Sequence, residues 1–156
     1  MVARTLRAAL QFSTLMAVGF TPAQGQLEVW AGATYAEALD GQWGGDARLS
    51  YTFPALPLGV FAGGDYFLTD CDEECSLWGW RFGGNLCVPL LGLTPYASGA
   101  WVNRNWESGD RTAEKEGLAL GLGLSLGLGL RVQIEASREF LGGDLDQWLL
   151  RASLGF

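Results

Sequence analysis

Hydrophobic and small or polar residues alternate along most of the chain after residue 25. The clearest stretch runs from Leu118 to Leu126, where every second residue is leucine and glycine, alanine or serine stands between. In a strand this spacing puts all the leucines on one face, whereas a helix would spread them around its surface. The pattern therefore predicts a strand rather than a poor helix or a low-complexity segment.

Eight segments show this period of two. They cover residues 26–35, 46–53, 58–68, 77–88, 94–104, 118–126, 130–137 and 147–156. The fifth is the least regular, because Tyr96, Ala100 and Val102 share one face while Trp101 falls on the other. The pattern predicts an all-β protein, an eight-stranded antiparallel up-and-down β-barrel, but alternation alone does not distinguish a membrane barrel from a soluble one.

The segments that connect the predicted strands alternate in length. Residues 54–57, 89–93 and 126–129 make short connections, whereas 36–45, 69–76, 105–115 and 141–146 are longer and more polar. Short periplasmic turns and longer extracellular loops are typical of outer-membrane barrels. An even number of strands then puts both ends of the barrel domain on the periplasmic side.

Bulk and charge distinguish the two faces of the predicted sheet. One face is aliphatic, with aromatic residues towards the strand ends: Tyr35, Tyr51, Phe53, Tyr66, Trp78, Trp80, Trp148 and Phe156. The other face is rich in glycine, which weakens an exposed strand but fits the narrow interior of a small barrel. We therefore expect an eight-stranded antiparallel up-and-down transmembrane β-barrel whose aliphatic face meets lipid, with an aromatic girdle. A soluble barrel with the aliphatic face inside is the alternative.

The glycine-rich face also carries charged residues. They are Glu28, Arg48, Asp65, Arg81, Arg131, Glu135 and Arg151. Because an unpaired buried charge is costly, these side chains are predicted to form a charge network in the lumen. Arginine suits such pairing through its forked donors, and the single lysine, Lys115, falls in a predicted loop. Acid–base chemistry by Glu28, Asp65 and Glu135 is the alternative.

The N-terminus has the features of a secretory signal peptide. Arg4 and Arg7 precede an apolar stretch over residues 8–20, and Ala23 and Gly25 supply the small residues of a cleavage site. Cleavage after Gly25 would leave one barrel domain, residues 26–156; the apolar run is too short for a retained anchor. The remaining chain has eight basic and 17 acidic residues, a net charge of −9 that disfavours nucleic acid.

Three cysteines are present, and Cys71 and Cys75 lie close enough in sequence for a small disulfide loop in an oxidising compartment. Cys87 is expected to stay unpaired. The predicted loops are acidic, and they either bind calcium or magnesium weakly or are simply solvated. Their carboxylates are Asp70, Asp72, Glu73, Glu74, Glu107, Asp110, Glu114, Glu116, Asp144 and Asp146.

The chain contains no histidine. A Ser–His catalytic pair and histidine-based metal sites are therefore excluded, and three cysteines at this spacing do not make a zinc site. We expect no catalytic residues, no metal and no cofactor, and hence a protein that is not an enzyme.

The eight alternating segments, the signal peptide and the ending QWLLRASLGF resemble the small eight-stranded bacterial outer-membrane β-barrel proteins. In that family the last strand carries the assembly signal, here matched by Trp148, Leu150, Ala152, Leu154 and Phe156. The resemblance implies export through the periplasm and insertion into the outer membrane by the barrel assembly machinery. It also implies a monomer surrounded by lipid and lipopolysaccharide. Histidine-dependent outer-membrane phospholipases, lipid A deacylases and omptin-type proteases share the architecture but not the chemistry.

Three functions remain open at this point. The first is a non-enzymatic barrel with a structural, surface-interaction or envelope-integrity role. The second is a narrow pore or small-ligand carrier, although side chains just fill an eight-stranded barrel. The third is a soluble exported barrel that binds an apolar ligand, as lipocalins do.

Overall fold

The computed structural model describes residues 26–37, 41–54, 56–68, 75–88, 90, 92–108, 111–128, 130–143 and 146–156. The predicted signal peptide lies outside the described residues, and so does Cys71 with the predicted Cys71–Cys75 disulfide. In the described part of the chain, no helix is long and apolar enough to cross a membrane.

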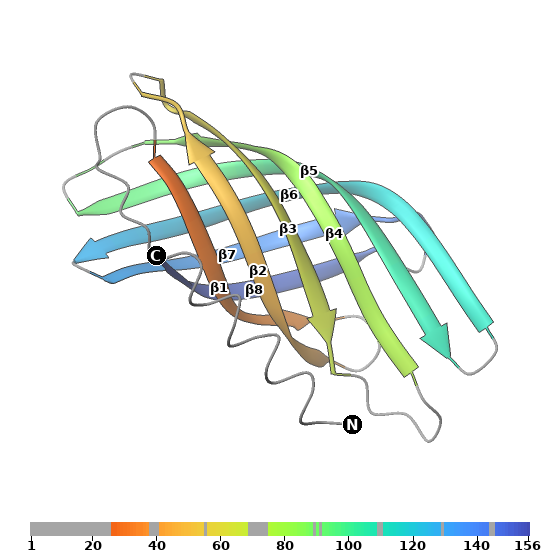
Figure 1. Cartoon of the computed structure of the whole chain (residues 1–156). Helices are drawn as coiled ribbons and strands as arrows, with labels where there is room; N and C mark the ends of the chain where they lie inside the picture. Colours follow the sequence, from red (N-terminus) through yellow and green to blue (C-terminus); the bar gives the residue numbers. More distant parts are fainter. Residues whose placement is uncertain are drawn as a thin grey trace.

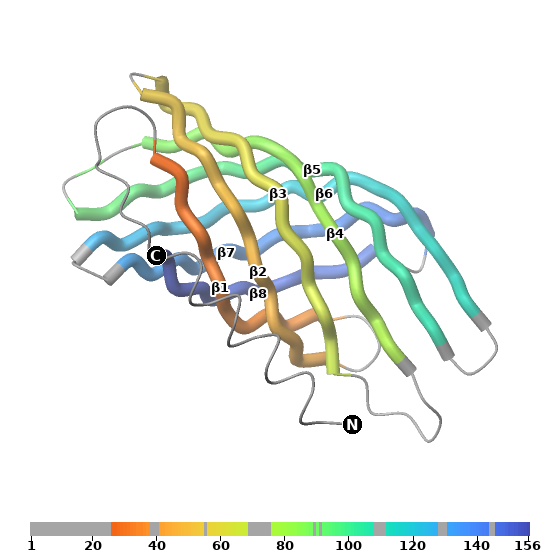
Figure 2. The backbone as a smooth tube through the Cα atoms, in the orientation of Figure 1, coloured from red at the N-terminus to blue at the C-terminus, as the bar shows by residue number. Residues whose placement is uncertain are grey.

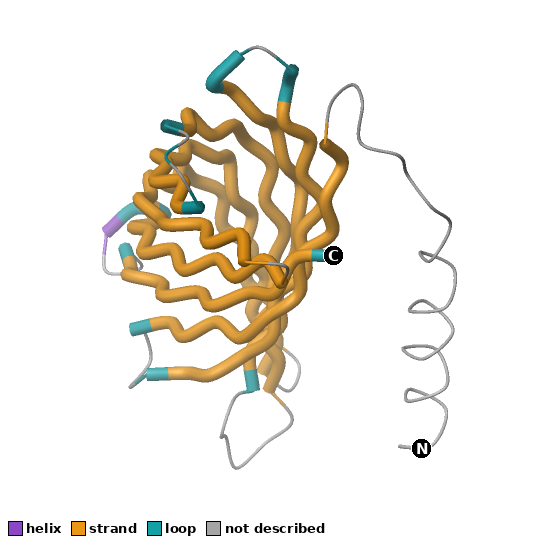
Figure 3. The backbone as a smooth tube through the Cα atoms, turned by 90° about the vertical axis from the view of Figure 1, so that its left-hand side faces the viewer, coloured by secondary structure: helices purple, strands orange, loops and turns teal. Residues whose placement is uncertain are grey.

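Eight antiparallel strands form one closed barrel (Figures 1 and 3). They are β1 (Gln26–Ala36), β2 (Gln42–Thr52), β3 (Leu58–Phe67), β4 (Cys75–Cys87), β5 (Leu93–Ser108), β6 (Arg111–Leu128), β7 (Leu130–Phe140) and β8 (Gln147–Gly155). Each strand pairs with the next along the chain, and β8 closes the barrel on β1 from Trp30↔Gly155 to Ala36↔Leu149. The predicted fold class and strand number are confirmed.

The two ends of the barrel differ. The terminus end holds Gln26, Phe156 and the turns β2–β3, β4–β5 and β6–β7; it lies on the left in Figure 1. The loop end holds the other four connections. There β4, β5 and β6 run past the other strands (Figure 2), and β6 pairs with β7 only from Leu118 onward.

One predicted loop is therefore wrong. Residues 105–115 belong mostly to β5 and β6, and only residues 109–110 separate these strands. Similarly, β2 begins at Gln42, so the first connection is shorter than predicted. The reason is that the outer part of this ladder, residues 107 and 112–116, is exposed and needs no apolar row. The period-two signal therefore disappears while the backbone pairing continues.

The apolar faces of the strands point outward. Leu118, Leu120 and Leu122 on β6 are 55%, 61% and 70% exposed, whereas Arg48 and Glu135 inside are 4% and 2% exposed. This polarity is the inverse of a water-soluble barrel and is that of a membrane barrel. The prediction of which face lies outside is confirmed.

Aromatic side chains gather on the outer surface, mostly near the loop end. Those exposed there are Trp43, Tyr66, Trp78, Trp80, Phe82, Trp101, Phe140 and Trp148, while Phe53 and Phe156 lie at the terminus end. Aromatic rings of this kind sit at the level of the lipid headgroups in membrane proteins. The loop end thus carries the denser part of the girdle.

The last residue takes part in the barrel closure. The Phe156 amide donates to the Val29 carbonyl at 2.9 Å, and the Val29 amide donates to the Phe156 carbonyl at 3.3 Å. The side chain of Phe156 points outward, 76% exposed. Trp148, Leu150, Ala152 and Leu154 lie on the same outer face, so the residues of the predicted assembly signal form one row.

Deleting Phe156 is expected to impair assembly, because it removes two backbone hydrogen bonds of the closing seam and the aromatic residue of the predicted signal. The measurement is the amount of heat-modifiable barrel in the outer-membrane fraction. A Phe156→Tyr variant, which keeps both the backbone and the ring, is the control and should assemble normally. An unchanged yield after the deletion would contradict the prediction.

Candidate functional site

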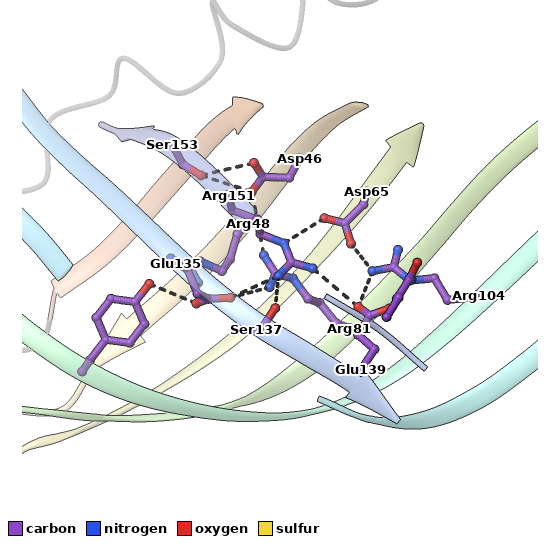
Figure 4. Close-up of polar contacts among 12 residues, drawn as sticks. Asp46, Arg48, Asp65, Arg81, Arg104, Glu135, Ser137, Glu139, Arg151 and Ser153 are labelled. Atoms are coloured by element: carbon purple, nitrogen blue, oxygen red, sulfur yellow. Dashed lines mark hydrogen bonds and ion pairs between the residues drawn. The ribbon is translucent and has the colours of Figure 1, made fainter. Parts of the chain in front are cut away.

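A cluster of four arginines and four carboxylates fills the middle of the lumen (Figure 4). It consists of Asp46, Arg48, Asp65, Arg81, Arg104, Glu135, Glu139 and Arg151, contributed by six strands and each at most 6% exposed. Glycine on the same inward rows leaves the volume that these long side chains occupy. Equal numbers of both charges make the formal charge of the cluster zero.

Glu135 on β7 is the centre of one half of the cluster. Its carboxylate accepts from Arg48 Nη1 at 3.2 Å, Arg81 Nη1 at 3.0 Å and Arg151 Nη1 at 3.2 Å. The Tyr96 hydroxyl donates to Glu135 Oε2 at 3.0 Å. One carboxylate thus balances several guanidinium groups through charge-assisted hydrogen bonds.

Asp65 and Glu139 form the other half with Arg104. Arg104 donates to both Glu139 oxygens, from Nε at 2.9 Å and from Nη2 at 2.5 Å. The same Nη2 lies 2.9 Å from Asp65 Oδ2. Arg151 links the two halves, because its Nε lies 3.3 Å from Asp65 Oδ1 while its Nη1 reaches Glu135. The cluster is therefore one connected network.

Aromatic rings support the guanidinium groups. Arg48 and Arg81 lie over Phe61, at 5.3 and 5.6 Å from the ring centroid, and Arg104 lies over Phe67 at 5.4 Å. These cation–π contacts hold the buried charged heads in place. Towards the loop end the lumen is closed by the apolar side chains of Ala36, Phe67, Leu77, Trp106 and Leu149.

The structure brings five of the seven predicted network residues together: Arg48, Asp65, Arg81, Glu135 and Arg151. Glu28 and Arg131 instead pair with each other near the terminus end, where they are 14% and 41% exposed. The Glu28–Arg131 pair therefore contributes less to the stability of the barrel than the buried pairs do, because water screens a partly exposed ion pair.

Three members of the cluster were missed by sequence reasoning. Asp46 begins the predicted strand 46–53 on the polar row of Arg48, and it was left out although it lies on that row. Glu139 lies one step beyond the predicted strand 130–137, on the polar row of Glu135, so continuing the alternation would have found it. Arg104 follows the inward row of Tyr96, Ala100 and Val102, which is apolar. That row looked like an outward face, and no local signal identified Arg104 as a residue of the lumen.

A cavity of about 320 Å³, here called the vestibule, lies between the cluster and the terminus end. Its lining includes Trp30, Asn85, Cys87, Tyr96 and Gln133. The Trp30 indole donates to Ser50 Oγ at 3.0 Å, and the Tyr96 hydroxyl meets Glu135 at the inner end of the vestibule. Beyond that point the side chains around Glu135 and Arg151 leave no room for a water molecule between them. The vestibule is therefore blind.

Gly123 makes the position of Tyr96 possible. The tyrosine ring packs directly on Gly123 in the neighbouring strand, and a Cβ atom there would overlap it. The ring can lie flat across the lumen only because this residue is glycine. In this position the Tyr96 hydroxyl reaches Glu135.

The charged groups of the cluster neutralise one another. Each of its four carboxylates lies within 4 Å of an arginine nitrogen. Over the described ranges, no three histidine, cysteine or acidic residues are grouped as a metal site would require.

Of the predicted acidic loop residues, Glu107, Glu114 and Glu116 lie on strands, and Asp146 accepts from the amides of Leu141 and Gly142. Asp70, Asp72, Glu73, Glu74, Asp110 and Asp144 lie outside the described residues.

Comparisons with known proteins give structural matches and no sequence matches. No protein-family model matches the chain. No curated protein matches it either.

Three solved outer-membrane barrels superpose on nearly the whole barrel. The N-terminal β-barrel domain of Pseudomonas aeruginosa OprF is 16% identical, with a TM-score of 0.60 over 85% of this chain and 98% of that one. Neisserial surface protein A is 13% identical, with a TM-score of 0.60 over 85% and 97%. Ail, the attachment invasion locus protein of Yersinia pestis, is 14% identical, with a TM-score of 0.56 over 86% and 100%.

These identities are low enough that the likeness concerns the backbone, whose strand number, antiparallel order and closure all agree. The chain has the fold of the small eight-stranded bacterial outer-membrane β-barrels.

Proposed function

We propose that this protein is an integral outer-membrane barrel with a structural and surface-presenting role, neither an enzyme nor an open pore. One observation carries the proposal: a connected, formally neutral ion-pair cluster fills the middle of a barrel whose outer surface is apolar. A soluble barrel would gain nothing from exposed leucines, and a pore would need an aqueous path through the lumen.

The outer-membrane location has independent support. The barrel has the polarity expected for lipid contact, and its solved structural relatives include outer-membrane proteins of different bacteria. The predicted signal peptide supplies the export route. With an even strand number the terminus end faces the periplasm and the loop end faces the exterior.

The closed lumen argues against transport. The vestibule opens at the terminus end and stops at Tyr96 and Glu135, and an apolar layer lies beyond the cluster. A blind cavity offers no passage to the loop end, so neither a narrow pore nor a transmembrane ligand carrier is supported.

A surface role is supported by the extension of β4, β5 and β6. From Arg111 to Glu116, strand β6 pairs with β5 alone among the described residues. The side chains of residues 112–116 are all exposed. An unpaired strand edge can accept a further strand from a partner, and its charged side chains discourage unspecific pairing. The extension therefore presents an interaction edge outside the membrane.

Reconstitution tests the proposal directly. Refolded protein in lipid vesicles should resist extraction at alkaline pH, as integral proteins do, and should give no conductance steps in a planar bilayer. The wide barrel of a general porin, measured in the same bilayers, is the positive control. Extraction into the soluble fraction would overturn the membrane location, and reproducible steps would overturn the closed lumen.

A further inference from the structure

Arg138 is a charged side chain in an unexpected place. It lies on the outward row of β7, between Ala136 and Phe140, and its side chain is exposed. Its partners across the neighbouring strands are Leu120 and Trp148, both outward and exposed. Among the described residues that face outward from the barrel, it is the one basic side chain.

Two aromatic rings fix the position of the guanidinium group. Its carbon lies 5.6 Å from the centroid of Phe140 and 5.7 Å from that of Trp148. Both rings belong to the girdle at the loop end, and Phe140 is the last residue of β7. Since such rings mark the level of the lipid headgroups, Arg138 lies at that level too.

No carboxylate of the residues that the structure describes forms an ion pair with this guanidinium group. Each of the other five arginines with described side chains has an acidic partner within 4 Å: Arg48, Arg81, Arg104, Arg131 and Arg151. Arg138 has none among the described residues. The acidic residues on the adjoining strands are set apart from it: Glu37 follows β1 on the far side of Trp148, and Glu116 lies beyond Leu118 on β6.

The cost of a charge on the lipid-facing surface of a barrel falls towards the headgroups, where anionic lipid groups can pair with it. An arginine held at that level without an acidic partner among the described residues is therefore placed to bind lipid. The anionic group available at headgroup level is phosphate, and the guanidinium fork matches its oxygens. The flanking rings leave those donors free, because cation–π contacts use the face of the guanidinium group.

We infer that Arg138, framed by Phe140 and Trp148, binds a phosphate group of a lipid in the leaflet at the loop end. This inference rests on the proposed function. Because that function places the loop end outside the cell, the lipid is lipopolysaccharide and the group is a phosphate of lipid A. Arg138 then acts as a lipid-anchoring residue on the outer surface of the barrel.

The test measures lipid retained by the refolded barrel in neutral detergent. The full barrel domain is titrated with bisphosphorylated lipid A, and bound lipid is counted by native mass spectrometry. Arg138→Leu should weaken retention about tenfold, the effect of losing a charged hydrogen-bonded contact. Arg138→Lys should lie between, because it keeps the charge and loses the fork. Arg131→Leu, which removes an arginine at the opposite end, is the matched control and should bind as the wild type does.

Two further arms identify the ligand. Dephosphorylated lipid A should bind the wild type as weakly as lipid A binds Arg138→Leu, and millimolar inorganic phosphate should not displace lipid A. Equal retention by Arg138→Leu and wild type, equal retention of both lipids, or displacement by inorganic phosphate would each overturn the assignment. Alkaline extraction of the same proteins from vesicles keeps the two proposals distinct. A wild type that stays in the membrane without favouring the phosphorylated lipid disproves only the Arg138 site.

Discussion

Replacing Glu135 by glutamine is expected to lower the free energy of unfolding of the barrel by about 3–5 kcal/mol, the cost of breaking a buried ion pair from one side. Glu135 binds three arginines and the Tyr96 hydroxyl, and all of these groups are buried. Glutamine is nearly the same size but carries no charge. The variant therefore leaves one uncompensated positive charge in the buried middle of the lumen. The urea midpoint of the barrel refolded in lipid vesicles measures the loss.

Glu28→Gln is the matched control for this experiment. Glu28 also pairs with an arginine, Arg131, but near the terminus end and partly exposed to solvent. Its loss is expected to cost less than about 1 kcal/mol. Arg48 has its ion pair with Glu135, so the double variant Arg48→Gln/Glu135→Gln restores neutrality and should be more stable than Glu135→Gln alone. A urea midpoint unchanged by Glu135→Gln would refute a structural role for the cluster.

Replacing Leu122 by arginine is expected to destabilise the barrel in lipid by about 2–4 kcal/mol, the cost of a charge near the midplane of the bilayer. Leu122 is 70% exposed and stands in the middle of the outward leucine row of β6. If the barrel were soluble, the same change at an exposed site would alter stability by no more than about 0.5 kcal/mol. The two environments thus predict clearly different results for one substitution.

Thr112→Arg provides the control on the same strand and the same face. Thr112 is exposed and lies in the part of β6 that extends beyond β7. Arginine there is expected to change stability by at most about 0.5 kcal/mol, because the side chain stays in water. Urea unfolding of both variants in lipid vesicles makes the comparison. Equal stabilities of the two variants would mean that the leucine row does not face lipid.

The strands could be predicted where one face was apolar. In β6 the alternation of Leu118 to Leu126 with small residues identified both the strand and its outward face. The same rule failed beyond the membrane band, where residues 105–115 continue as a ladder that is mostly polar and has no alternating apolar row. It was also ambiguous in β5, because the inward residues Tyr96 and Val102 are themselves apolar.

The sequence could predict that the lumen contains a charge network, but it could not predict all the residues that form it. Buried arginines opposite carboxylates were expected from their place on the glycine-rich rows, and Glu135 does lie among three of them. The sequence did not predict the ion pair of Arg104 and Glu139. These residues are 35 positions apart in sequence and lie on strands that are not neighbours. Their contact runs across the lumen, and no local pattern encodes it.

By itself the sequence determined the number of strands, their antiparallel order and the face that meets lipid. These features follow from the alternation of apolar with small or polar residues, which is a local pattern along the chain. Only the tertiary structure decided which charges meet. In a closed barrel the stagger between strands sets the height of each inward residue. That stagger gathers Asp46, Arg104 and Glu139 into the cluster and sets the Glu28–Arg131 pair apart near the terminus end. It also leaves Arg138 on the outer surface without an acidic partner among the described residues, since its height there is fixed by the pairing of β7 with β6 and β8.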